Sequence, residues 1–441
     1  MANYHDIETC ADEIAKTAKT LAQWRHNQQS GTPSRSTLSE VPDRIRLAQS
    51  RLASDTTKLQ LMLDEPSDLI RRLALHTQLL ASLQWLCEFQ VLACIPLDIS
   101  VPFADVAEIS GVPESQLRRV ARLMATVGFL EEPQLGQIGH SLLSAQFVTQ
   151  PALLDAAIFL SGTVAPAALK MPEATRQFGA SNRPDDSAYA AVLNSKVPVS
   201  SIFQLQPKLQ RQFSTYLAHG LGDSEAAVLD VLMNMDWLAL GNATVVDVGS
   251  ASATTANKLS IRFPALNLIA QPYNTPGFFE SGSFGFAALP AQLGGNVTVQ
   301  QRSAGSVQPV PDAAVYILRV PSPSPSLAWD RIVSQTVAEL RIHLEVLRNN
   351  PSARLILTAL VLPGAATASY GQDVQARLRD LSLMQLSNGR QREREEVVEL
   401  VAGVRDGSGG LVPTNEYRSP SSPLVAFEIR YHAQQGSMYI S

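Results

Sequence analysis

The sequence predicts an α/β protein: a mostly parallel, doubly wound Rossmann-like sheet preceded by an all-helical region with a winged-helix segment. Two observations support this class. After about residue 240, short β-rich runs alternate with helical segments over roughly 200 residues, which is typical of a sheet covered on both faces. Before that point, apolar residues recur at helical spacing. A chain of 441 residues is long enough for two or three domains.

The N-terminal half begins with apolar positions at helical spacing over 4–28 and again from about 42 to 63, separated by the turn-rich stretch SGTPSRSTLSEVP. Amphipathic helices ahead of any domain able to bury them predict a homodimer. The parts expected along the chain are a helical arm (1–65), a winged-helix-like dimerisation domain (66–150), connecting helices (151–235) and the Rossmann-like domain (236–441).

The winged-helix pattern lies in PFADVAEISGVPESQLRRVARLMATVGFLEEPQLGQIGHS, with Gly111 and Pro113 in the turn between two helices. Such a segment suggests DNA binding, but the second helix offers only Arg118, Arg119 and Arg122 for phosphate contacts. A packing role is therefore favoured over DNA binding.

Charge and cysteine content exclude several classes of partner. The chain has 35 basic and 40 acidic residues, a net charge of −5, which leaves no electrostatic footprint for nucleic acid or an anionic membrane. Its three cysteines, Cys10, Cys87 and Cys94, show neither metal-type pairing nor a disulfide framework. The N-terminus lacks the apolar run of a signal peptide or membrane span. We expect a cytoplasmic protein that binds small molecules or proteins and no metal.

The expected strands of the sheet are β-rich runs: 244–249, 267–272, 297–301, 313–320, 353–363 and 424–432. In an open parallel sheet, ligands bind beyond the carboxyl ends of the strands. We therefore expect a ligand site near Gly249, Gln271 and Arg319.

Several stretches together resemble the S-adenosylmethionine (SAM)-dependent O-methyltransferases of fungal secondary metabolism, and the resemblance covers the whole chain. They are FADVAEISGVPESQLRRVARLMATVGFLEE, HSLLSAQF, VVDVGSASATTANKLSIRFPALNLIAQ, VYILRV and PSARLILTALVLP. The resemblance implies a class I methyltransferase domain, with residues 151–235 as the roof of the acceptor pocket.

The cofactor turn of that family is degraded in this sequence. After Asp247, Gly249 is retained, but Ser250 and Ala251 stand where further glycines would let the backbone approach SAM. Gln271 ends the next strand and is followed by a proline where the family has a ribose-binding acid. The resemblance thus implies a degenerate site, with no required cofactor and at most weak or vestigial SAM binding.

The catalytic base of the family is also missing. The family's His-Asp-Trp segment is replaced by Pro323, Ser324 and Pro325, and proline cannot accept a proton. This combination is similar to the methyltransferase-like pericyclases of the leporin type. It implies an enzyme that dehydrates a 2-pyridone polyketide–peptide precursor to a quinone methide, or directs its hetero-Diels–Alder or Alder-ene cyclisation.

The resemblance assigns catalytic roles to Arg319 and His140, which would hold the pyridone oxygens. The residues expected to bind substrate are Phe213, Tyr216, Arg211, Lys196 and Trp329. Arg319 could instead form a structural ion pair, and His140 could be an ordinary polar residue at the end of the wing. Two other functions stay open: a working O-methyltransferase, and a non-catalytic partner or regulatory protein on the same scaffold.

Overall fold

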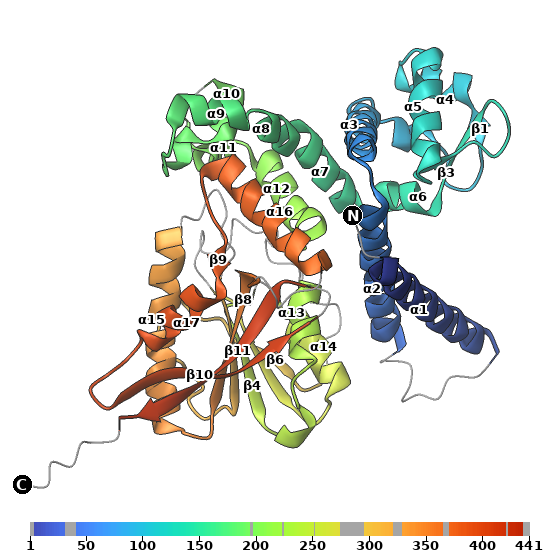
Figure 1. The fold of residues 1–441 in the computed structure, drawn as a ribbon. Coiled ribbons are helices and arrows are strands. Elements are labelled where there is room, and N and C mark those ends of the chain that lie inside the picture. The colour runs from blue at the N-terminus through green and yellow to red at the C-terminus, as the bar shows by residue number, and fades with distance from the viewer. Residues whose placement is uncertain are drawn as a thin grey trace, which may run out of the picture. The chain divides into compact units, whose positions relative to one another are not determined.

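The computed structural model describes residues 4–30, 41–194, 197–222, 225–250, 252–273, 295–320, 329–364, 370–419 and 422–434 (Figure 1). The chain forms two compact units. Unit 1 comprises Met1–Leu63, Gly222–Leu383 and Gly389–Ser441, and unit 2 comprises Asp64–Leu221 and Met384–Asn388. The predicted class is confirmed: a mostly parallel sheet follows a helical N-terminal region.

The sheet of unit 1 has the strand order β10-β11-β8-β7-β4-β5-β6, and β9 pairs with β8 off this path. Its strands are β4 (Thr244–Val248), β5 (Asn267–Gln271), β6 (Val297–Val299), β7 (Val315–Arg319), β8 (Arg354–Leu362), β9 (Arg392–Glu393), β10 (Gly409–Arg418) and β11 (Leu424–Ala433). The pairs from β6 to β8 are parallel, whereas β11 is antiparallel to both β8 and β10. Every strand expected from the sequence is present.

Helices cover both faces of this sheet, as its apolar strands require. The helices of unit 1 are α1 (Tyr4–Ser30), α2 (Val41–Leu63), α13 (Glu225–Leu232), η4 (Leu238–Leu240), α14 (Thr254–Arg262), α15 (Trp329–Asn349), α16 (Tyr370–Ser387) and α17 (Arg394–Ala402). The end of α16, from Met384, belongs to unit 2. One core cluster packs α13 and α14 against the sheet, and a second packs α15 and α17 against its other face (Figure 1). The helices packed on both faces hold the strands of the sheet in place, and with them the strand ends.

Unit 2 contains the winged-helix pattern. Its elements there are α3 (Pro66–Glu88), η1 (Val91–Cys94), β1 (Val101–Pro102), α4 (Phe103–Ser110), α5 (Glu114–Thr126), β2 (Leu130–Glu131), β3 (Gln137–His140) and α6 (Leu142–Thr149). The strands form a small antiparallel sheet of order β1-β3-β2. Gly111 ends α4 with φ +70°, a conformation that glycine adopts without strain.

The rest of unit 2 is helical. Its elements are α7 (Pro151–Phe159), the π-helical turn η2 (Leu160–Val164), α8 (Ala165–Leu169), α9 (Met171–Phe178), η3 (Pro184–Asp186), α10 (Ala188–Leu193), α11 (Val199–Leu205) and α12 (Pro207–Gly220). By length and composition alone, the run Pro151–Leu169 could cross a membrane. Its residues Phe159, Val164 and Ala167 instead pack in a buried cluster, as in the core helix of a folded unit.

Candidate functional site

Arg319 ends β7 and binds two carboxylates inside unit 1. Its Nη2 lies 3.0 Å from Asp247 Oδ2 on β4, and its Nη1 donates to Glu225 at the start of α13. Thr255 donates a further hydrogen bond to Glu225. The side chains of Arg319, Asp247 and Glu225 are 13, 3 and 14% exposed, so this is a buried ion-pair network. It matches the structural alternative for Arg319.

Burial controls the titration of this network. It raises the pKa of Asp247 to about 6, although the Arg319 charge lowers it in part. Burial alone would lower the pKa of Arg319, but Asp247 and Glu225 together raise it above its ordinary value. The guanidinium therefore stays charged, and two of its nitrogens are engaged by the protein's own acids. Its Nε is buried and has no hydrogen-bond partner among the described residues.

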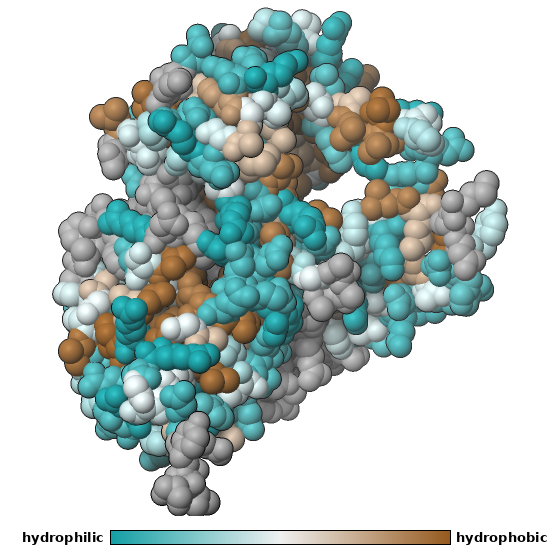
Figure 2. Space-filling model, turned by 60° about the vertical axis from the view of Figure 1, so that its left-hand side comes forward, coloured by the Kyte–Doolittle hydropathy of each residue, from teal (hydrophilic) through white to brown (hydrophobic). Residues whose placement is uncertain are grey.

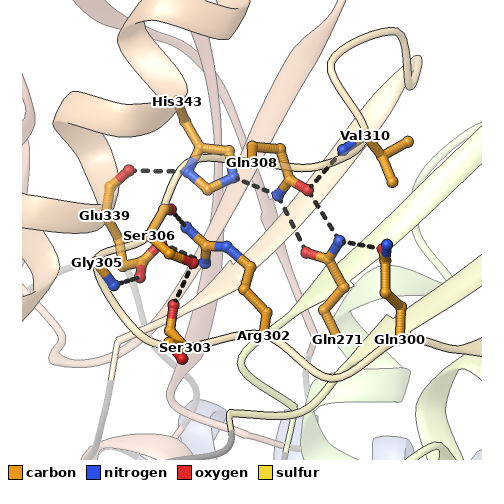
Figure 3. Close-up of polar contacts among 10 residues, drawn as sticks. All are labelled: Gln271, Gln300, Arg302, Ser303, Gly305, Ser306, Gln308, Val310, Glu339 and His343. Carbon is orange, nitrogen blue, oxygen red and sulfur yellow. Dashed lines mark hydrogen bonds and ion pairs between the residues drawn. The ribbon is translucent and has the colours of Figure 1, made fainter.

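Gln271, at the end of β5, lies in a second polar cluster (Figure 3). It is fully buried and exchanges hydrogen bonds of 2.8 and 3.1 Å with the side-chain amide of Gln308. Its Nε2 also donates to Gln300 Oε1 at 3.0 Å. The amide that was expected at the cofactor site is therefore bonded to neighbouring side chains.

A buried ion pair and a histidine complete this cluster (Figure 3). Arg302 Nη1 lies 2.8 Å from Glu339 Oε2, and both side chains are less than 5% exposed. His343 Nδ1 donates to the Glu339 carbonyl at 2.8 Å, which leaves Nε2 to accept from Gln308 at 3.3 Å. Burial lowers the pKa of His343 to about 4, so the ring is neutral at pH 7.

Gly249 and Tyr273 meet at the end of β4. Gly249 has φ +67° and donates its N–H to the Gln271 carbonyl. A Cβ at this position would lie 2.4 Å from Cε2 of the Tyr273 ring, so only glycine leaves room for the ring. Ser250 beside it is 1% exposed, and its hydroxyl has no hydrogen-bond partner in the described part of the chain. The turn after β4 is thus packed against the protein's own Tyr273 ring.

His140 lies in unit 2 and bonds only within it, as far as the described residues extend. Its Nε2–H donates to the Leu92 carbonyl at 3.1 Å, and its Nδ1 lies 2.9 Å from the Ser144 hydroxyl. Burial lowers its pKa. His140 thus connects β3 to η1 and α6. Arg319 belongs to the other unit.

The predicted substrate-binding residues have separate environments. Phe213 and Tyr216 are 1 and 3% exposed and stack with Phe159 in the core of unit 2, at centroid distances of 5.4 and 5.5 Å. Arg211 is exposed and pairs with Asp155 at 2.7 Å. The predicted positions that lie outside the described residues or side chains are Lys196, Ala251 and the side chain of Trp329.

The sequence reasoning missed Glu225 and Gln308, the partners of Arg319 and Gln271, and it also missed Glu339, the partner of Arg302. No local signal marks them, because they lie 94, 37 and 37 residues from Arg319, Gln271 and Arg302. Among the described residues, no group of three or more His, Cys, Asp or Glu side chains could hold a metal ion.

The fold is that of a SAM-methyltransferase-like protein. A pericyclic reaction enzyme matches with a TM-score of 0.63 and 16% identity over 96% of this chain and 100% of that one. LepI in complex with SAM gives the same values. OxaC in complex with S-adenosylhomocysteine (SAH) and oxaline gives 0.58 and 16%, over 97% of this chain and 100% of that one. At such identities the likeness concerns the fold alone.

Three curated relatives are far more similar in sequence. The aflatoxin cluster transcriptional coactivator aflS of Aspergillus flavus is 44% identical over 97% of both chains. The dothistromin biosynthesis regulatory protein aflJ of Dothistroma septosporum is 41% identical over 98% of this chain and 99% of that protein. The monodictyphenone cluster transcriptional coactivator mdpA of Emericella nidulans is 40% identical over 98 and 99%. No protein-family model matches the chain. The chain belongs to this family of biosynthetic-cluster transcriptional coactivators.

These relatives overturn the predicted reaction. The prediction of a pericyclase acting on a 2-pyridone alkaloid precursor is wrong, and so is the prediction of an enzyme, because relatives 37–44% identical are named regulators or coactivators. A small-molecule substrate loses its support for the same reason. The methyltransferase-like fold and the setting in fungal secondary metabolism are confirmed.

The prediction of no required cofactor is contradicted as well. Solved proteins of this fold hold SAM or SAH, including LepI, which shares the methyltransferase-like architecture on which the prediction relied. An altered turn after β4 therefore does not establish that a cofactor is dispensable, and we withdraw that inference.

Proposed function

We propose that this protein is a pathway-specific transcriptional coactivator of a fungal biosynthetic gene cluster, and that it acts through protein contacts on a methyltransferase-like scaffold. The observation that carries this proposal is the 37–44% identity to named cluster regulators over nearly the whole chain. A role in transcription would bring the protein to the nucleus, in place of the cytoplasm expected from the sequence.

The winged-helix segment supports action through protein partners rather than DNA. Arg122 forms two 2.8 Å hydrogen bonds with Glu132 and holds the pKa of that carboxyl at about 2. Arg118 pairs with Glu114 and lies over the Phe103 ring. Two of the three arginines of α5 are thus already paired with acids, which weakens any attraction to phosphates.

Exposed apolar side chains at helical spacing offer surfaces for protein partners. On α16, Val374, Leu378 and Leu381 are 43–48% exposed, and they follow one another at intervals of four and three residues. On α3, Ile70 and Leu73 are 65 and 53% exposed. Figure 2 shows groups of hydrophobic residues among hydrophilic ones on the face drawn. Contiguous exposed apolar patches mark interaction sites in soluble proteins.

Deletion of the gene in its host separates a coactivator from an enzyme. We expect transcripts of the neighbouring biosynthetic genes to fall together, so that supplying a late intermediate does not restore the product. An enzyme would leave transcripts unchanged while its substrate accumulated, and that result would overturn the proposal. Complementation with Leu378→Glu tests the α16 surface, and Leu169→Glu, an 82% exposed residue on α8, is the matched control.

A homodimer joined through the N-terminal helices also stays a proposal. Its support is the amphipathic character of α1 and α2, which pack on each other. Light scattering of the full chain should give twice the mass of one chain, and a stable monomer would refute the idea.

A further inference from the structure

A groove of about 550 Å³ lies within unit 2, between the end of α3 with η1 on one side and the α7–η2 run on the other. Its volume falls within the range of about 300–1,000 Å³ that is usual for small-molecule sites. None of the residues predicted from the sequence lines it. It is therefore a separate feature from the polar clusters of unit 1.

The walls of the groove combine apolar and polar side chains in similar measure. Its apolar residues include Leu92, Phe147, Leu154 and Ile158, which come from the three elements η1, α6 and α7. Cys87 also lines it, and burial raises the pKa of its thiol to about 12, so the sulfur is neutral and unreactive. Such walls suit a ligand that has both apolar and polar parts and is held without a covalent bond.

Two irregular backbone segments border this groove. The π-helical turn η2 places Ser161 and Gly162 in its lining, and a Cβ added at Gly162 would meet no described atom within 4 Å. On the opposite side, Gln90 has φ +52°, which is rare for a residue with a side chain. π-turns and strained backbone residues are both concentrated at functional sites. Their meeting in one groove points to binding.

The groove also carries one cation with no acid beside it. Lys208 lies exposed at its edge on α12, and no ion pair to it is recorded within the described part of the chain. Of the two acids in the lining, Asp155 is already paired with Arg211 at 2.7 Å, and Glu88 is exposed. A ligand with an acidic oxygen could therefore pair with Lys208 while its apolar body lies in the groove.

We infer that this groove binds an amphipathic small molecule with one acidic oxygen, a phenol or carboxylate, which contacts Lys208. The molecule would be a regulatory ligand, because the described lining presents no nucleophile paired with a base. This inference goes beyond the proposed function and can be tested on the pure protein without reference to transcription.

Two fluorescent probes with one scaffold test the inference. 8-Anilinonaphthalene-1-sulfonate carries an anionic group, and N-phenyl-1-naphthylamine lacks it. We expect each to bind the full chain saturably at one site per chain. Gly162→Trp should abolish binding of both probes, because the new side chain enters open space in the groove. Lys208→Glu should weaken the anionic probe about tenfold, consistent with loss of a charge-assisted contact, and the neutral probe less than twofold.

Matched variants separate the groove from the general effects of a bulky ring or a reversed charge. Leu169→Trp adds the same ring at an exposed position outside the groove, and Lys258→Glu reverses an exposed lysine of α14; neither should change the affinity. If a folded Gly162→Trp protein bound both probes unchanged, the probes would bind elsewhere, and the proposal that the groove is the binding site would be refuted. If Lys208→Glu weakened the binding of both probes equally, the proposed contact between Lys208 and an acidic oxygen of the ligand would be refuted. Loss of binding in parallel with dimer formation, followed by light scattering, would identify the groove as an interface and also refute the proposal.

Discussion

Arg319 Nη2 lies 3.0 Å from Asp247 Oδ2, and the two residues sit on neighbouring parallel strands, near the carboxyl ends of β7 and β4. Because the same guanidinium also binds Glu225, one buried cation holds two acids. The set carries one negative charge in excess when all three groups are ionised, and burial makes that excess costly. The geometry favours a structural role for the arginine that was expected to contact substrate.

Arg319→Ala should destabilise the protein strongly, because it leaves Asp247 and Glu225 buried without their cation. Breaking a buried ion pair from one side typically costs about 3–5 kcal/mol. Urea titration followed by circular dichroism measures the change. Arg211→Ala is the control, since the Arg211 side chain is 61% exposed and its pair with Asp155 should contribute less than about 1 kcal/mol. Similar losses in the two variants would contradict a structural role for Arg319.

His343 should make unfolding pH-dependent in a known direction. Its pKa is about 4 in the folded protein and about 6.5 when unfolded, so the unfolded chain binds the extra proton. The free energy of unfolding should therefore fall by about 3 kcal/mol as the pH drops from 6.5 to 4. Asp247, whose pKa is raised to about 6, changes stability in the opposite sense over the same range.

The measurement must therefore be a difference between proteins. Subtracting the urea-unfolding curve of His343→Gln from that of the wild type between pH 4 and 7 isolates the histidine contribution. A difference that does not vary with pH would show that His343 is not held neutral by its surroundings. Asp247→Asn is the companion variant for the contribution of opposite sign.

Gly249→Ala should cost more than Gly305→Ala, although both glycines have positive φ. Gly249 has φ +67° and Gly305 has φ +76°, so the backbone penalty is similar, about 1–3 kcal/mol. Only at Gly249 does the new methyl group meet another described side chain, the Tyr273 ring at 2.4 Å. Thermal unfolding compares the variants, and Tyr273→Leu should recover part of the loss at Gly249. Equal losses would mean that the ring moves away freely.

Phe213→Ala should lower the stability of unit 2, because Phe213 is a core residue of this unit and not part of a binding site. The ring lies 5.1 Å from that of Phe203 and 5.4 Å from that of Phe159, in a closed aromatic cluster. Removing a buried phenylalanine typically costs about 3–5 kcal/mol. Leu205→Ala, at a position 80% exposed, should change stability by less than about 0.5 kcal/mol. Hydrogen exchange measured on α7 and α12 would show whether the loss is confined to this unit.

The sheet could be predicted because its strands are locally marked. The run RLILTALVL of β8 is almost wholly buried between neighbours, so its apolar residues are continuous. β10 was missed because its sequence GGLVPTNEYR contains residues that disfavour strands, and only its pairing with β11 holds it extended. The local sequence pattern identifies strands that are themselves apolar. The other strands form because they pair with strands elsewhere in the sequence.

The candidate site could be predicted only in part, for a related reason. The strand-end position of Arg319 was readable from the sequence, but its partner Glu225 comes from a helix 94 residues earlier. The prediction of the function was wrong for a different reason. Missing family residues, such as the proline after Gln271, show which contacts changed, and they do not specify a new reaction.

The ion-pair network of Arg319, Asp247 and Glu225 also constrains how this protein can change over time. Replacing any one of Arg319, Asp247 and Glu225 alone leaves a buried charge without its full set of partners. A substitution at one of these three residues would be harmful while the other two are unchanged, and it would be tolerated once both of them have been replaced. Such dependence on order is strong epistasis. The triad should therefore be inherited as a block, either kept whole or replaced whole, in lineages that share this fold.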